Sequence, residues 1–274
     1  EVLDTKPHVV PGAKTEGEER GTVEFRDVSF RYPGAAADEL EHISFKVRKG
    51  QTLAVIGATG SGKTTLASLI PRFYDATAGT VLVDGVDVRA YTFDALYNKL
   101  GYVTQKAVLF SGTVEDNVFF GQSAAEKTDA SLQAALSLSQ AAEFVDKYPE
   151  KAAHPIAQLG RNVSGGQKQR LSIARALARK PEILIFDDSF SALDYKTDAV
   201  LREGLAKQLP GTTKIIVAQR ISTIRNADQI LVLDRGEIAG LGTHDELMVS
   251  CPVYREIAMS QLSEEELKKG GVSK

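Results

Sequence analysis

Residues 57–64 of this chain read Gly57-Ala58-Thr59-Gly60-Ser61-Gly62-Lys63-Thr64. Their spacing is that of a phosphate-binding loop, or P-loop, in which the last glycine precedes Lys-Thr. Residues 53–56 form a short apolar run typical of a buried strand, and residues 64–70 have the pattern of a helix. A strand, a glycine-rich loop and a helix in this order are the context that the motif requires, which disfavours the alternative of a chance glycine turn.

The chemistry of such a loop follows from its residue types. Glycines let backbone N–H groups close around phosphate oxygens, and the N-terminus of the following helix adds the positive end of its dipole. Lys63 is expected to reach the terminal phosphates, and the hydroxyl of Thr64 can ligate Mg²⁺. The residues predicted to bind a nucleotide through this loop are Gly57, Ala58, Thr59, Gly60, Ser61, Gly62, Lys63, Thr64 and Thr65.

A second apolar strand, residues 183–186, ends at Asp187. Open α/β sheets bind their ligands at the C-terminal ends of the strands, where this carboxylate is expected to lie. We expect Asp187 to hold Mg²⁺ through water, because Mg²⁺ gives up its hydration shell reluctantly. A buried strand that ends in aspartate is common by itself, and it is the nearby P-loop that favours the functional interpretation.

Apolar strands recur after this point and alternate with helical segments. The predicted strands are 183–186, 215–217 and 230–233, and the predicted helices between them are 196–208 and 221–226. Such alternation is typical of a parallel sheet with crossover helices.

The first part of the chain has a different pattern, because alternating residues in 22–32 and a similar run at 43–47 indicate an antiparallel sheet. Helical periodicity over 124–148 and 167–179 predicts a helical insert in the middle of the chain. The predicted fold class is therefore α/β, a P-loop NTPase with a mainly parallel core sheet, an N-terminal antiparallel β subdomain and a helical subdomain at about 106–178.

Composition limits the function classes. The net charge of −3 over 274 residues gives no electrostatic reason to expect nucleic acid or an anionic membrane surface as a partner. The single cysteine, Cys251, excludes an internal disulfide. The longest apolar runs are far shorter than the roughly 20 residues that span a bilayer, so we expect no membrane crossing within the chain. Because Glu1 is not an initiator methionine, the chain is expected to be a piece of a longer protein.

A second motif precedes the strand that ends at Asp187. Residues 162–170 read Asn-Val-Ser-Gly-Gly-Gln-Lys-Gln-Arg and resemble the signature motif of ATP-binding cassette (ABC) proteins. A Ser-Gly-Gly sequence that opens a helix presents a hydroxyl and bare N–H groups to an anion. The alternative, an N-cap that merely starts a helix, does not explain the paired glycines. In the family the anion is the γ-phosphate bound by the other subunit, so the resemblance implies a dimer in which Ser164, Gly165, Gly166 and Gln167 contact the partner's nucleotide.

The resemblance extends from residue 22 to about residue 262. Tyr32 matches the aromatic residue that stacks on adenine in the family, although an isolated tyrosine is more often simple packing. Gln105 matches the residue that senses Mg²⁺ and the attacking water. Residues 191–194, Ser-Ala-Leu-Asp, match the loop that crosses the dimer interface. The resemblance thus implies that the metal site contains Thr64, Gln105 and Asp187.

The segment 110–117 resembles the part of ABC exporters on which the coupling helices of the transmembrane domains dock. The resemblance therefore implies transmembrane partners that contact residues around 105–120, and a location at the cytoplasmic face of the cell membrane. Residues 1–21 have linker composition and are expected to follow a transmembrane domain, whereas the polar tail 263–274 is expected to fray.

Two departures from the family pattern bear on hydrolysis. The position after Asp187, usually the glutamate that polarises the attacking water, is Asp188, and the switch position usually held by histidine is Gln219. Aspartate is one methylene shorter, and a displacement of about 1 Å can lower a rate by about 10²-fold. Glutamine can hydrogen-bond a phosphate but cannot become cationic. The pattern resembles the degenerate subunit of heterodimeric bacterial ABC exporters, with slow hydrolysis at a site whose expected catalytic residues are Asp188, Gln219, Gln105 and Lys63.

Two other interpretations are compatible with the motifs. One is a nucleotide-gated binding or regulatory module that holds Mg-ATP without useful turnover, and it differs from the exporter subunit in whether ATP is hydrolysed alone, with a partner or never. The other is a chromosome-maintenance or translation ATPase of the same superfamily. Such proteins carry long coiled-coil insertions or tandem cassettes, and the sequence contains neither.

Overall fold

The structure is a computed structural model that describes residues 9–122 and 127–262. The first half contains β1 (Val23–Phe30), β2 (Leu40–Val47), β3 (Thr52–Gly57), α1 (Lys63–Leu69), β4 (Ala78–Val83), β5 (Val86–Asp87), α2 (Phe93–Lys99), β6 (Leu100–Val103), β7 (Gly112–Thr113), α3 (Val114–Val118) and α4 (Asp129–Leu138). The second half contains α5 (Ala142–Val145), β8 (Pro155–Ile156), α6 (Gly165–Ala178), β9 (Ile183–Asp187), α7 (Tyr195–Gln208), β10 (Thr213–Val217), α8 (Ile221–Ile224), β11 (Gln229–Asp234), β12 (Glu237–Gly242), α9 (His244–Ser250) and α10 (Pro252–Gln261).

The central sheet carries the ends of the motif-bearing strands to one edge. Among the described residues, its strand order is β12-β11-β3-β10-β9-β6, and all neighbours are parallel except β12, which runs antiparallel to β11. In register, Val217 lies opposite Asp187, and Val103 lies opposite Phe186. The segments that follow β3, β9, β10 and β6 therefore leave the sheet at the same edge, which is where the predicted site residues come together.

A second, antiparallel sheet has the order β2-β1-β4-β5 within the described ranges. Its apolar side chains share a core with one face of the central sheet, and Leu53 and Val55 of β3 belong to that core. Ala54 and Ile56, on the opposite face of the same strand, belong to a second core with the helices α3 to α10. Because central strands are buried on both faces, they read as continuous apolar runs. This layered arrangement confirms the predicted α/β fold class with its antiparallel N-terminal part.

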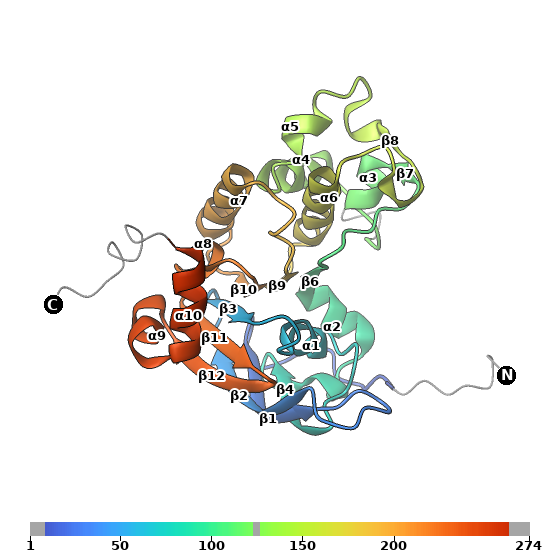
Figure 1. The fold of residues 1–274 in the computed structure, drawn as a ribbon. Helices are drawn as coiled ribbons and strands as arrows, with labels where there is room; N and C mark the ends of the chain where they lie inside the picture. Colours follow the sequence, from blue (N-terminus) through green and yellow to red (C-terminus); the bar gives the residue numbers. More distant parts are fainter. Residues whose placement is uncertain (1–8, 123–126, 263–274) are drawn as a thin grey trace.

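The segment between β6 and β9 forms the expected helical insert. Figure 1 shows α3, α4, α5 and α6 together in the upper part of the view, apart from the antiparallel sheet in the lower part. The small β7-β8 pair lies beside them. α6 is the longest of these helices and packs against both α3 and α4.

The stretch 124–148, for which the sequence shows helical periodicity, contains two separate helices in its described part, α4 and α5. Residues 123–126 lie outside the described residues, and Thr128 caps α4 through a reciprocal pair of hydrogen bonds, so that helix begins at Asp129. It ends because Gln140 adopts a left-handed backbone, with φ of 61°, which a helix cannot continue through. α5 begins only at Ala142. Periodicity alone did not reveal this break, because the residues on both sides of it are apolar at helical spacing.

Residues 9–21, predicted to be linker, run along residues 84–92. Lys14 forms a parallel bridge with Tyr91, and its carbonyl accepts a hydrogen bond of 2.9 Å from the Thr92 amide. The Glu19 amide donates to the carbonyl of Asp84 at 3.2 Å. These backbone contacts attach the segment to the β4-β5 side of the domain, whereas the predicted polar tail 263–274 lies outside the described residues.

Candidate nucleotide-binding site

The P-loop connects β3 to α1 with a backbone that requires glycine at its last turn. Gly62 has φ of 96°, and a Cβ atom there would lie 2.6 Å from the side chain of Leu40. Lys63 lies across the loop, since its ammonium group donates to the carbonyls of Gly57 and Ala58 at 2.9 and 2.6 Å. Burial lowers the pKa of Lys63, while the nearby carboxylates act in the opposite direction. The arrangement places one cation beside a glycine-rich backbone of the kind that binds anions.

Asp187, at the end of β9, meets the first turn of α1. The hydroxyl of Thr64 donates to Oδ1 of Asp187 at 2.9 Å, and the hydroxyl of Tyr102 donates to Oδ2 at 3.2 Å. Burial raises the pKa of Asp187, and these two hydrogen bonds oppose that shift. A hydroxyl and a carboxylate at contact distance are the hard oxygen donors that Mg²⁺ prefers, so the pair fits the predicted metal site. Tyr102 was not predicted from the sequence.

Asp188 forms hydrogen bonds with the two glutamine side chains that were predicted from the sequence to lie in the same site. Nε2 of Gln105 donates to Oδ2 of Asp188 at 2.9 Å, and Nε2 of Gln219 donates to the same oxygen at 2.6 Å. Asp188 is 6% exposed and has φ of 48°, a left-handed conformation that aspartate tolerates better than most residues. Its amide donates to the carbonyl of Val217 at 3.0 Å, which fixes this backbone against β10. Gln105 thus contacts Asp188 and not the Thr64–Asp187 pair.

Tyr32 lies against the P-loop helix through its hydroxyl. It shares a hydrogen bond of 2.9 Å with Oγ1 of Thr65, which follows the predicted magnesium ligand Thr64. Its ring meets Phe30 and Tyr74 edge to face, with centroid distances of 4.8 and 5.2 Å. The ring orientation is therefore fixed on several sides. Tyr74 had no sequence signal, because a tyrosine in a loop after a helix has many possible roles.

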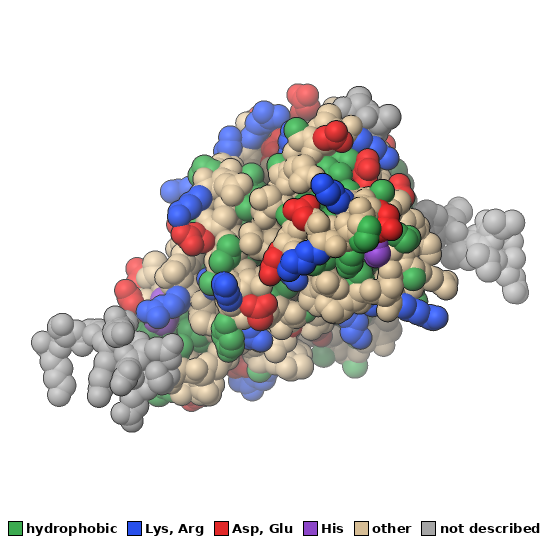
Figure 2. Space-filling model, turned by 90° about the horizontal axis from the view of Figure 1, so that it is seen from above, with side chains coloured by type: hydrophobic (Ala, Val, Ile, Leu, Met, Phe, Trp, Pro, Cys, Tyr) green, Lys and Arg blue, Asp and Glu red, His purple; other side chains and the backbone are tan. Residues whose placement is uncertain are grey.

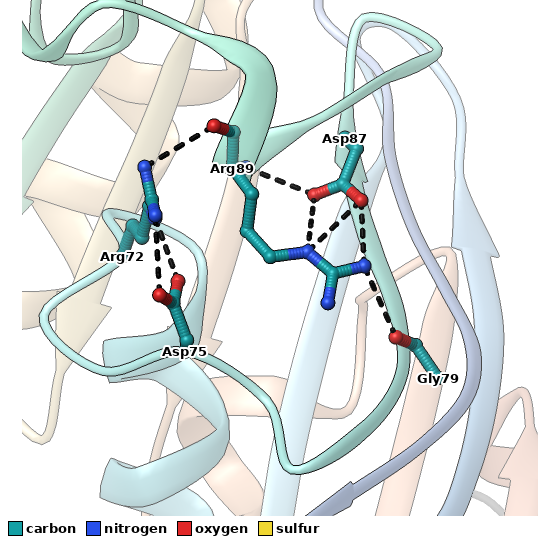
Figure 3. Close-up of polar contacts among 5 residues, drawn as sticks. All are labelled: Arg72, Asp75, Gly79, Asp87 and Arg89. Carbon is teal, nitrogen blue, oxygen red and sulfur yellow. Dashed lines mark hydrogen bonds and ion pairs between the residues drawn. The ribbon is translucent and has the colours of Figure 1, made fainter. Parts of the chain in front are cut away.

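The loop that carries Tyr74 is tied to the β4-β5 region by a cluster of two arginines and two aspartates (Figure 3). Arg72 is 5% exposed and holds Asp75 with two hydrogen bonds of 2.6 and 3.1 Å. It also donates to the carbonyl of Arg89 at 3.3 Å. The guanidinium of Arg89 in turn binds Asp87 and the carbonyl of Gly79. These contacts join the end of the P-loop helix to the antiparallel sheet.

The signature residues open α6. Ser164 is the N-cap: its hydroxyl accepts from the amide of Gln167 at 3.3 Å, and Gln167 Oε1 accepts from the amide of Ser164 at 2.8 Å. A Cβ atom on Gly165 would meet no atom within 4 Å, and one on Gly166 would only reach ordinary contact with the carbonyl of Ala192, at 3.5 Å. Packing within the chain therefore does not explain the paired glycines.

The signature does not join the P-loop within the chain. Figure 1 places α6 in the upper part of the view and α1 in the lower part. Over residues 9–122 and 127–262, no hydrogen bond connects Ser164 to the P-loop. Residues 191–194 lie between the signature and Gln219 in sequence, and the hydroxyl of Ser191 donates to the carbonyl of Asp188 at 2.7 Å.

The segment 110–117 carries one member of an exposed aromatic pair. Phe110 and Phe120 stack with their centroids 4.3 Å apart, are 44% and 50% exposed, and are both covered by the guanidinium of Arg175. The side chain of Asn117 forms hydrogen bonds with both the backbone amide and the backbone carbonyl of Phe110.

A cleft of about 260 Å³ adjoins this segment and is lined by residues that include Phe73, Tyr97, Tyr102, Phe120, Arg175 and Arg179. Figure 2, which looks down on the upper part of Figure 1, shows charges of both signs interspersed with hydrophobic side chains.

The fold and the site define a P-loop NTPase with an inserted helical subdomain that carries a Ser-Gly-Gly helix start. The pattern of the ABC transporter family matches residues 40–191, more than half of the chain. The chain therefore belongs to the ABC transporter family and is a nucleotide-binding domain of that family.

Several named proteins are similar to it. An uncharacterized ABC transporter ATP-binding protein of Mycobacterium tuberculosis is 48% identical over 242 residues, which is 88% of this chain and 41% of that protein. An ATP-dependent lipid A-core flippase of Aromatoleum aromaticum is 42% identical over 97% of this chain and 44% of its own length. A putative multidrug export ATP-binding/permease protein of Bacillus subtilis is 43% identical over 87% of this chain and 41% of its own length.

Among solved structures, a bacterial Atm1-family ABC exporter with ATP bound superposes with a TM-score of 0.90 and 36% identity, over 96% of this chain and 46% of that one. The chain thus spans less than half the length of these relatives. Within the described residues, none of the helices combines the length and the apolar character needed to cross a membrane.

Proposed function

We propose that this chain binds Mg-ATP and serves as the nucleotide-binding domain of an ABC exporter, in which ATP binding and hydrolysis are coupled to transport. The observation that supports this best is the convergence at one sheet edge of Lys63, the Thr64–Asp187 pair and Asp188 with its two glutamines. Membership of the ABC transporter family and relatives named as a flippase and an exporter support the same function.

In this proposal each group has a distinct task. The P-loop amides and Lys63 bind the phosphates, and the ring of Tyr32 stacks on the adenine base. Thr64 and Asp187 hold Mg²⁺, which when bound neutralises charge on the phosphoryl oxygens. Asp188 and Gln105 orient the attacking water, and Gln219 donates a hydrogen bond toward the γ-phosphate.

We propose further that this site hydrolyses ATP slowly. The side chain of Asp188 is one methylene shorter than the glutamate that usually polarises the attacking water. Both glutamine amides already donate to its Oδ2 atom. Gln219 supplies a neutral donor where a cation would stabilise the transferring phosphoryl group more strongly.

The signature motif is proposed to complete the site of a second nucleotide-binding domain, which we take to be a different subunit. Ser164 and Gly165 are exposed, and a Cβ atom on Gly165 would have no other atom of this chain within 4 Å. A bound anion would find the amides of a helix start there. The partner's γ-phosphate is the anion that a head-to-tail dimer would bring to this place.

Transmembrane domains are the second proposed partner, with docking on the surface around residues 105–120. The exposed Phe110–Phe120 pair and the adjoining aromatic cleft provide apolar contact area for a helix. In that assembly the chain lies at the cytoplasmic face of the cell membrane. The alternative, an ATP-gated module without useful turnover, predicts tight Mg-ATP binding but no hydrolysis alone or with a partner.

The proposal is tested by Lys63→Ala, which removes the P-loop cation and should abolish tight Mg-ATP binding in calorimetry. Lys207→Ala is the matched control, because that lysine is 72% exposed on α7 and pairs only with Glu203 among the described residues. Unchanged affinity in Lys63→Ala, with both proteins folded, would contradict the P-loop assignment.

A further inference from the structure

The last residue of α10, Gln261, binds the loop that carries Gln219. Oε1 of Gln261 accepts a hydrogen bond of 2.9 Å from the amide of Ile221, and Nε2 of Gln261 donates to the carbonyl of Gln219 at 2.7 Å. Both ends of one side-chain amide are therefore used on backbone groups about 40 residues earlier in the chain. A side chain needs both a donor and an acceptor to make this pair of contacts, and an amide has both.

The helix that presents Gln261 is anchored by core packing in addition to its contacts with this loop. Tyr254 and Ala258 of α10 are fully buried in the core that lies under the helices, and Tyr254 shares a hydrogen bond of 2.7 Å with His244 of α9. The core packing thus sets the position of α10, and Gln261 projects from its end. The same core contains Ile221 and Ile224 of α8, so the Gln261 contacts add to packing that joins α10 to this part of the chain.

Beyond Gln261, the loop is held by the buried side chain of Ile221 and by the guanidinium of Arg220, which lies over the ring of Tyr195 at 4.9 Å. A cavity of about 550 Å³ borders it and is lined by Ser191, Tyr195, Gln219, Arg220, Ser222, Gln261 and Leu262. The polar contact of Arg220 here is a long one, 3.4 Å to the carbonyl of Ser191. The Ala218 amide donates to the carbonyl of Val55 in the sheet at 3.1 Å and Ile221 is buried in the core, so Gln219 and Arg220 lie between these two anchors.

The contacts continue from the loop into the candidate site. The backbone carbonyl of Gln219 accepts a hydrogen bond from Gln261. The side chain of the same Gln219 donates a hydrogen bond to Oδ2 of Asp188 at 2.6 Å. We propose that Gln261 is a positioning residue that sets where the Gln219 side chain lies relative to Asp188 and a bound γ-phosphate. The inference rests on the proposed function. It places α10 in control of the switch residue, through the loop and not through the nucleotide.

Two variants separate the two bonds. Gln261→Ala removes both, whereas Gln261→Glu keeps an acceptor for the Ile221 amide but places a carboxylate oxygen against the carbonyl of Gln219. Met259→Ala is the control, because Met259 lies on the same helix and is 58% exposed. If Gln219 moves by about 1 Å or less, kcat should fall about 10-fold in both Gln261 variants. KM and the Mg-ATP dissociation constant should change less than about 2-fold, because the P-loop contacts are untouched.

The experiment combines kinetics with a spectroscopic readout on the full 274-residue chain. ATP turnover is measured for the wild type, both Gln261 variants, Met259→Ala, Gln219→Ala and the double variant Gln219→Ala/Gln261→Ala. Positioning through Gln219 requires that Gln261→Ala has no further effect on kcat once the Gln219 side chain is gone. In ¹⁵N NMR spectra, the Ile221 amide and the Gln219 side-chain amide should shift in Gln261→Ala and stay in place in Met259→Ala.

The outcomes distinguish the inference from the function on which it rests. Unchanged Gln219 and Ile221 resonances in Gln261→Ala overturn the inference, whatever the rate of turnover. So does an equal loss of kcat with and without the Gln219 side chain, since that result indicates a purely structural role. Absence of Mg-ATP binding in the wild type, with the expected NMR shifts present, refutes the proposed function and leaves the Gln261 contact established.

Discussion

At the scale of single residues, the candidate site differs from the family pattern at two positions. Asp188 is one methylene shorter than the usual glutamate, and Gln219 lacks the imidazole of the usual histidine. Asp188 and Gln219 are in direct contact, at 2.6 Å, so their effects should be coupled. Asp188 is also the point where Gln105 joins the network, at 2.9 Å. One carboxylate oxygen thus accepts hydrogen bonds from both of the glutamines that we propose orient water and phosphate.

We predict that Asp188→Glu together with Gln219→His raises ATP turnover. The longer carboxylate and the switch imidazole should supply positioning and charge stabilisation, effects commonly worth about 10²–10⁴-fold. Steady-state ATPase of the symmetric dimer gives the measurement, and each single change should recover less than the pair. Flat hydrolysis in the double variant, with ATP still bound, would remove the mechanism of the degenerate-site proposal.

A second residue-scale prediction concerns Tyr32. Tyr32→Ala should weaken ATP binding by about 1–3 kcal/mol through loss of base stacking, and should leave inorganic triphosphate binding unchanged. Tyr32→Phe keeps the ring and its edge contacts with Phe30 and Tyr74 but loses the hydrogen bond to Thr65, so the loss should be smaller. Calorimetry with both ligands decides, because an equal loss for ATP and triphosphate argues against stacking.

At the scale of elements, the sequence was most informative where a strand is buried on both faces. β9, β10 and β11 read as continuous apolar runs and were predicted to within a residue or two at each end. β6 was missed because it is short and contains Gly101, a position where a Cβ atom would lie 2.8 Å from Pro181. Its strand conformation depends on parallel pairing with β9, which is a contact far away in sequence.

The candidate site likewise contains parts that local sequence predicts and parts that depend on contacts between distant residues. The P-loop, the end of β9 and the signature are contiguous in sequence, so local patterns indicated them. Tyr74 contacts Tyr32, and Gln261 contacts the Gln219 loop. Nothing in the sequence next to either residue predicts these contacts. Tertiary structure was required because these partners are brought together by the packing of α10 and of the loop after α1.

The pairing of α9 with α10 predicts a pH dependence of stability. Burial lowers the pKa of His244 below its ordinary value of 6.5, and Arg225 adds to the effect while Asp245 opposes it. Below pH 6.5 the unfolded chain takes up a proton that the folded chain does not, so stability falls as the pH drops toward the folded pKa. The slope is at most about 1.4 kcal/mol per pH unit.

We predict that His244→Gln flattens this acid-side decline, measured as the midpoint of thermal unfolding from about pH 7.5 to about pH 5.0, the range in which histidine titrates. His42→Gln is the control, because the hydrogen bond to Asp27 raises the pKa of exposed His42 and its contribution has the opposite sign. That contribution is present at low pH and is lost as the pH rises. An unchanged slope in His244→Gln would contradict the assignment of the decline to the α9-α10 contact.

At the scale of the whole molecule, the chain carries two groups of residues that we propose are half-sites, and it does not bring them together. The P-loop and the Asp187–Asp188 pair lie at the edge of the central sheet, while the signature opens α6 in the helical part (Figure 1). In the proposed heterodimer each composite site combines the P-loop side of one subunit with the signature of the other. Changes at the two half-sites of this chain should therefore have unequal effects on the complex.

The last prediction compares the two half-sites in the purified complex by steady-state ATPase. Asp188→Asn alters a site proposed to be slow, so the rate should fall little. Gly165→Ala places a methyl group where this chain has no atom within 4 Å, so the fold should tolerate it, yet it should block the partner's γ-phosphate and lower kcat by about 10²-fold or more.

Ser164→Ala should have a similar effect on kcat, but it also removes a helix cap worth about 0.5–2 kcal/mol of stability. Thr128→Ala removes the matching cap of α4 in the same helical part and controls for that loss. A large fall in rate with Thr128→Ala would assign the Ser164 effect to stability alone. If Asp188→Asn proves as damaging as Gly165→Ala, the two composite sites are equivalent, the chain acts in a symmetric dimer, and Asp188 is a competent base for hydrolysis.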